Sequence, residues 1–216
     1  MRKILFLLAL LFVSCSCVGC GNKEIAALMS EQTMIYFYGE SGGNWCSVSV
    51  GERENPYIID GSHTQNTTFS LVVFQPSSAI EGNVIEIELK VDGKSEKTTL
   101  ELNPLNMTYM ADLGYALKED SVLSLCFQGE EIVLENQSQC FEVDYKEAIK
   151  IGFEKASREQ DFYQNGVLKV EGYLKIFDGS LFGGEGLYWC FSIIGKEEVS
   201  KNVLINVNNR HDIFLG

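Results

Sequence analysis

The chain has 216 residues and a formal net charge of −13, from 30 acidic and 17 basic residues. Nucleic-acid binding depends on clustered Lys and Arg, so this acidity argues against nucleic acid as a partner. With 45% hydrophobic and 11% aromatic residues and only three prolines, the sequence is typical of a folded chain and not of a disordered one.

The first 19 residues have the pattern of a secretory signal. Arg2 and Lys3 precede an apolar run from Ile4 to Val13, and small residues follow. The run is too short to span a bilayer, which requires about 20 apolar residues. We therefore expect residues 1–19 to be removed as a signal peptide, which leaves 15 basic and 30 acidic residues and a net charge of −15.

The segment Cys17-Val18-Gly19-Cys20 resembles the lipobox of bacterial lipoproteins, in which a small residue precedes the cysteine that receives the lipid. The resemblance implies that Cys20 is the lipid attachment site and that the chain is held on the extracytoplasmic face of the cell membrane. Cys17 stands where the family usually has an aliphatic residue, and Cys15 is a competing attachment site. Ordinary cleavage without lipid attachment would instead give a secreted protein.

Residues 20–31 are predicted to form a short tether, and period-two hydrophobicity begins after them. Ile85, Ile87 and Leu89 alternate with charged residues and give the clearest amphipathic strand. Asp92-Gly93 and Gly129-Glu130 are typical of hairpin turns. Further strands are expected over 34–38, 46–50, 68–74, 98–102, 121–127 and 131–134, with an edge at 140–143. Together they predict a mainly β fold, an antiparallel Ig-like β-sandwich over residues 32–143.

The segment Gly39 to Trp45 (GESGGNW) resembles the opening of small β domains in exported Gram-positive proteins. We interpret it as a bend that lets Trp45 close one end of the sandwich. Trp45, Tyr36 and Tyr38 also offer the aromatic faces that a carbohydrate- or cell-wall-binding module uses, and that function stays open as an alternative.

The pattern changes after Val143. Asp144 and Glu147 form a capping-box-like start, and apolar residues recur at helical spacing from Tyr145 to about Gln160. Strands are expected over 167–177, 187–194 and 203–207. Residues 144–216 are therefore predicted to form a small α+β module of one helix and a three-stranded antiparallel sheet.

This order of elements, with Tyr188-Trp189 in a strand and a closing segment from Val203 to Ile213, resembles a PepSY-type module. Asn206 and Asn208 stand where acids are common in that family, and Arg210-His211 stand where it has Thr-Gly. The resemblance implies an exported, envelope-linked protein and, as one alternative, an inhibitor of peptidases.

Four cysteines lie beyond the signal, in apolar, strand-like runs that are typical of buried free thiols. They are Cys46, Cys126, Cys140 and Cys190. Disulfides stay open as an alternative, because an exported chain can form them. The Gly129-Glu130 turn sets Cys126 opposite Val133 and so does not by itself bring Cys126 to Cys140.

No pattern of nucleophile and base, and no metal-ligand spacing, accompanies the two histidines, His63 and His211. We therefore expect no enzyme activity, no cofactor and no metal. The expected function is binding: a lipid-anchored protein that recognises another envelope protein or a peptide. Its sheet edges and the hairpin from Phe177 to Trp189 are the expected contact surfaces.

Overall fold

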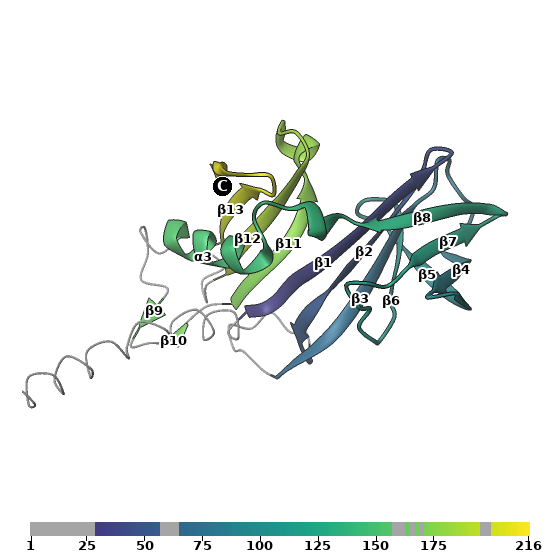
Figure 1. The fold of residues 1–216 in the computed structure, drawn as a ribbon, viewed down its shortest axis with the longest axis horizontal. Coiled ribbons are helices and arrows are strands. Elements are labelled where there is room, and N and C mark those ends of the chain that lie inside the picture. The colour runs from purple at the N-terminus through teal and green to yellow at the C-terminus, as the bar shows by residue number, and fades with distance from the viewer. Residues whose placement is uncertain (1–28, 57–64, 157–162, 165–166, 169–170, 195–199) are drawn as a thin grey trace, which may run out of the picture.

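The computed structural model describes residues 29–56, 65–156, 163–164, 167–168, 171–194 and 200–216 (Figure 1). Its first half is built from strands β1 (Met29–Ser41), β2 (Asn44–Glu54), β3 (Asn66–Gln75), β4 (Val84–Val91), β5 (Lys94–Asn103), β6 (Thr108–Asp112), β7 (Leu123–Phe127) and β8 (Glu130–Asn136). Their hydrogen-bonded order is β1-β2-β3-β6-β5-β4-β7-β8, and β8 pairs back onto β1.

The prediction of an Ig-like β-sandwich is wrong, because these eight strands close into a barrel. Closure occurs where Phe37 and Tyr38 of β1 pair with Asn136 and Glu135 of β8. A sandwich keeps two separate sheets with free edges, whereas here the first and last strands share backbone hydrogen bonds. The sequence signals neighbouring hairpins, but it carries no local signal for a contact between residues about 100 positions apart.

The barrel interior is filled by side chains. The alternation that marked Ile85, Ile87 and Leu89 places all three inside, and Phe37 and Phe74 fill the space between opposite walls. An eight-stranded barrel is just wide enough for side chains to fill. The interior therefore serves as the hydrophobic core.

Two-residue turns set the register of three barrel hairpins. Gly42-Gly43, Asp92-Gly93 and Gln128-Gly129 each have two consecutive positive φ angles, as type I′ turns require. The Asp92-Gly93 turn is confirmed. The other predicted turn, Gly129-Glu130, was placed one residue too late, because a type I′ turn favours glycine at its second central position. Cys126 consequently lies opposite Glu131 and not opposite Val133.

Three short segments also differ from expectation. Residues 108–112 form β6, which the sequence did not signal. The edge expected over 140–143 is not a strand, since Gln137–Cys140 forms the 3₁₀ helix η1, capped by the Asn136 side chain. β1 begins at Met29 and so includes three residues of the segment predicted as a tether.

The C-terminal half continues the same sheet. Its elements are α3 (Tyr145–Ala156), β9 (Tyr163–Gln164), β10 (Val167–Leu168), β11 (Glu171–Asp178), η2 (Gly179–Phe182), β12 (Leu187–Ile194), β13 (Ser200–Asn206) and β14 (Asn209–Leu215). β11 pairs in parallel with the first residues of β1, and β12, β13 and β14 follow in antiparallel order (Figure 1). The result is one 12-stranded sheet.

The predicted separate module of a helix and a three-stranded sheet is therefore wrong. Six described strands follow the helix: β9 and β10 pair with each other in a separate two-stranded sheet, and β11 to β14 are joined by β1 to the barrel without a break in the sheet. The junction pairs Met29 with Gly172 and Gln32 with Leu174. A parallel pairing between segments this distant in the chain leaves no hairpin signal in the sequence.

A second core forms where α3 packs on one face of β11, β12 and β13. The helix begins at Tyr145, as predicted, and Asp144 caps it by accepting a hydrogen bond from the Glu147 amide at 2.8 Å. Trp189 is fully buried below the helix, and its indole Nε1 donates to the Val143 carbonyl at 2.7 Å. Gly152 allows the close approach, since a Cβ there would lie 2.2 Å from Cγ of Phe191.

We expect Gly152→Ala to lower the free energy of unfolding by about 1–3 kcal/mol, because the added methyl group would force α3 away from Phe191. Lys150→Ala, on the exposed side of the same helix, is the matched control and should be nearly neutral. Urea titration followed by circular dichroism measures both. Equal stability of the Gly152→Ala and wild-type chains would contradict this packing.

Candidate functional site

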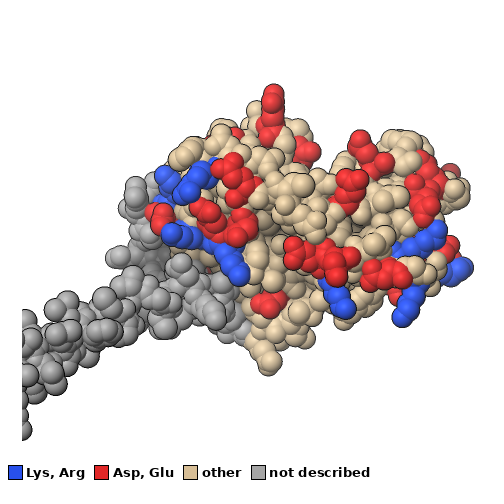
Figure 2. Space-filling model, viewed as in Figure 1, with Lys and Arg blue, Asp and Glu red and all other residues tan. Residues whose placement is uncertain are grey.

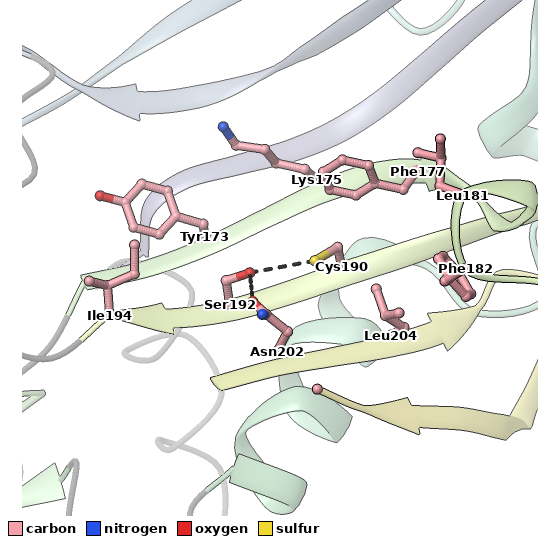
Figure 3. Close-up of a pocket in the computed structure, with 11 residues that line it drawn as sticks. Tyr173, Lys175, Phe177, Leu181, Phe182, Cys190, Ser192, Ile194, Asn202 and Leu204 are labelled. Carbon is pink, nitrogen blue, oxygen red and sulfur yellow. Dashed lines mark hydrogen bonds between the residues drawn. The ribbon is translucent and has the colours of Figure 1, made fainter. Parts of the chain in front are cut away.

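α3 covers only one face of the C-terminal sheet, and the opposite face carries the candidate site. Leu174, Trp189 and Phe191 point toward α3 and are completely buried. The residues that alternate with them line a groove of about 540 Å³ on the other face (Figure 3). The lining residues are Tyr173, Lys175, Phe177, Leu181, Phe182, Cys190, Ser192, Ile194, Asn202, Leu204 and Gly216.

The groove face is continuous with the outer wall of the barrel. Glu31 of β1 pairs with Tyr173 of β11 on one side and with Arg53 of β2 on the other. Lys175 extends toward β1 (Figure 3), where its Nζ lies 3.4 Å from Oε1 of Glu31 and 5.9 Å from the centroid of the Tyr173 ring. The one basic residue of the groove lining is thus paired with a carboxylate, and the groove carries little net charge.

A short polar line crosses the otherwise apolar floor. Ser192 Oγ donates to Oδ1 of Asn202 at 2.7 Å and lies 3.5 Å from Sγ of Cys190. Burial raises the pKa of the Cys190 thiol, so this side chain stays protonated at neutral pH. These three residues can orient a polar group of a ligand, while the surrounding side chains contact its apolar parts.

The helix η2 forms the wall at one end of the groove. Asp178 caps η2 by accepting a hydrogen bond from the Ser180 amide at 2.8 Å, and hydrogen bonds from Ser180 lower the pKa of this carboxyl. Gly183 ends η2 in the left-handed conformation, at φ 82°. The Phe182 ring packs edge-on against Tyr188 at a centroid distance of 4.9 Å. The cap and the ring contact hold the wall against the sheet.

The hairpin from Phe177 to Trp189, which the sequence analysis expected to be a contact surface, contributes part of the groove lining. Phe177, Leu181 and Phe182 line the groove, but Trp189 points into the core below α3. Sequence reasoning missed the floor residues Ser192 and Asn202. One sequence pattern could have indicated this face. The segment that forms β11 has apolar residues at both even and odd positions, which indicates that each face of the strand packs against another element or binds a ligand.

The three aromatic residues considered for carbohydrate binding lie on the outer wall of the barrel. Tyr36, Tyr38 and Trp45 are half-buried, and the Tyr38 and Trp45 rings lie 6.4 Å apart between centroids. Trp45 therefore packs beside Tyr38 on the wall and closes no end of a sandwich. Burial and the hydrogen bond to Glu40 raise the pKa of Tyr38 to about 12.

The remaining predicted residues are dispersed. Cys46 is buried in the barrel, Cys126 and Cys190 are half-buried, and Cys140 is exposed, contrary to expectation; all four are free thiols. His211 is exposed on β14. The predicted lipid attachment site Cys20, its competitor Cys15, and His63 lie outside the described residues.

Comparisons with protein-family models, with curated proteins and with solved structures find no match. Within the described ranges, no group of three or more His, Cys, Asp or Glu side chains is placed to hold a metal ion. Every helix in the part of the chain that the structure describes is too short or too polar to cross a membrane. The groove is therefore the feature of the described residues that bears on function.

The thiols should label with iodoacetamide in a fixed order, which peptide mass spectrometry of the folded full-length chain can measure. We expect Cys140 to react first, Cys190 more slowly, and Cys46 only on unfolding, because exposure decreases in that order. Since burial raises the Cys190 pKa, its labelling rate should still increase above about pH 9, where an ordinary thiol is mostly ionised. A Cys46 as reactive as Cys140 would contradict the closed barrel.

Proposed function

We propose that this chain is a lipid-anchored, non-catalytic binding protein on the extracytoplasmic face of the cell membrane, and that its groove holds an extended segment of a partner protein or peptide. The observation that carries the proposal is the apolar groove of about 540 Å³ on the face of the C-terminal sheet opposite α3. Clefts of this size, lined by aromatic and aliphatic side chains with a few polar groups, are typical of binding sites.

Exposed apolar side chains around the groove support this function. Leu181 is 74% exposed, and Phe177 and Phe182 are 39% and 37% exposed. Single exposed apolar side chains are common on folded proteins, whereas contiguous apolar patches mark interaction sites. The floor is a four-stranded sheet backed by a packed core, so the groove is held in shape before a partner arrives.

The position of the groove fits an anchor at the N-terminal side. β11 runs parallel to β1, so η2 lies at the end of β11 that is distant from Met29. Eight strand residues at about 3.3 Å each separate that end from the start of β11 by roughly 25 Å. A lipid on Cys20 would hold the Met29 end near the membrane and leave the aromatic wall of the groove accessible to partners in the envelope.

The anchor is tested by Cys20→Ser in the full-length chain. We expect the wild-type chain to enter the detergent phase in Triton X-114 partitioning and to carry an acyl-modified N-terminal peptide in mass spectrometry. Cys20→Ser should move it to the aqueous phase, and Cys15→Ser, the matched control, should not. The opposite pattern would assign the lipid to Cys15, and aqueous partitioning of the wild-type chain would reject the anchor.

Binding in the groove is tested with peptides selected from a random display library on the full-length chain in detergent. Leu204→Asp places a charge on the apolar floor and should weaken the selected peptides about tenfold or more. Val133→Asp, which changes an exposed apolar residue on β8, is the matched control and should bind as the wild-type chain does. An equal effect of both substitutions would place the binding site elsewhere.

A further inference from the structure

A second, polar pocket lies on the same face of the C-terminal sheet. It has a volume of about 570 Å³, and its main side chains are Glu185, Tyr188, Asn206 and Asp212. Two carboxylates contribute to its lining, and the described lining contains no Lys or Arg. The pocket is therefore anionic, whereas the adjacent groove is apolar and nearly neutral.

The strands set the spacing between the pocket and the groove. Tyr188 in the pocket and Cys190 in the groove are two residues apart on β12, and Asn206 and Leu204 have the same relation on β13. Residues i and i+2 of a strand lie about 6.6 Å apart and on one face. An extended peptide has the same repeat, so side chains i and i+2 of a bound segment match the two sites.

An aromatic cluster of Phe182, Tyr188 and Phe214 connects the lining of the groove to the lining of the pocket. Phe182 lies 4.9 Å from Tyr188 and 5.8 Å from Phe214, and Tyr188 lies 5.9 Å from Phe214, between ring centroids. Phe182 belongs to the groove and Tyr188 to the polar pocket. A bound segment that occupies both sites would cross this cluster with its backbone and with the aliphatic part of one side chain.

The charge of the pocket is held in place by hydrogen bonds. Tyr188 Oη donates to Oδ2 of Asp212 at 2.6 Å, and Nδ2 of Asn206 donates to the same oxygen at 3.0 Å. The hydrogen bond to Asp212 is the main cause that raises the pKa of Tyr188, and burial and the charge of Glu185 act in the same direction. In the groove, by contrast, Glu31 pairs with Lys175.

From this juxtaposition we infer that the partner is an extended protein segment with a basic side chain two residues from an apolar one. The basic group binds Glu185 and Asp212, and the apolar side chain enters the groove. The inference rests on the proposed function of the groove. A mature chain of net charge −15 also attracts a cationic partner over long range, and acidic side chains are spread over the face seen in Figure 2.

The test uses the full-length chain in detergent and the peptides selected for groove binding. We expect Arg or Lys to be enriched two positions from Leu, Ile or Phe. The best peptide is then compared with a twin that carries citrulline for Arg, or acetyl-lysine for Lys, by fluorescence anisotropy. The charged peptide should bind about five- to tenfold more tightly at low salt, and the preference should shrink as salt screens the pair.

In the double variant Glu185→Gln/Asp212→Asn, the charged peptide should bind no more than about twofold more tightly than its uncharged twin, because both carboxylate charges are lost. The side-chain oxygen of Asn at position 212 can still accept hydrogen bonds from Tyr188 and Asn206. Glu119→Gln, an exposed acid between β6 and β7, is the control and should keep the full preference. If both twins bind equally but Leu204→Asp still weakens them, the groove function stands and the charge inference is overturned. If Leu204→Asp has no effect, both fail.

Discussion

Strand β1 is the element on which the rest of the structure depends, because one of its two edges forms backbone contacts with three different segments of the chain. Its first residues pair with β11, the Tyr36 amide donates to Ser138 Oγ at 2.7 Å, and Phe37 and Tyr38 pair with β8. The opposite edge pairs with β2 along most of its length. Since only one strand can lie beside each part of this edge, the barrel and the C-terminal sheet pair with different parts of it.

The division requires β1 to change direction partway along its length. The pairing with β2 shifts between Thr33 and Ile35, which leaves Met34 as an extra residue, and a bulge of this kind bends and twists a strand. Gly51 lies opposite, where a Cβ would come within 1.9 Å of the Gln32 carbonyl oxygen. The bend lets β11 diverge from β1, so that α3 covers one face and the groove opens on the other.

Much of the local structure is readable from particular residues. Asp92-Gly93 marks its turn because both positions adopt positive φ, and Asp144 marks the start of α3 because its carboxylate accepts the Glu147 amide. Only part of the groove lining can be predicted from the sequence. Phe177 and Phe182 belong to a hairpin whose apolar residues predict contact, but Ser192 and Asn202 look like ordinary strand residues until β11, β12 and β13 are aligned.

Most of the short strands, the Asp92-Gly93 turn and the start of the helix could be predicted from the sequence, since each depends on residues within a few positions of one another. The acidic charge follows from composition alone. The tertiary structure alone decided the closure of β8 onto β1, the parallel junction with β11 and the open face of the C-terminal sheet. Distant strands pair through backbone N–H and C=O groups, which nearly every residue carries, so the sequence does not mark which strands will pair. β11 carries large apolar residues on both faces, so alternation does not reveal that α3 covers Leu174 and leaves Tyr173 to line the groove.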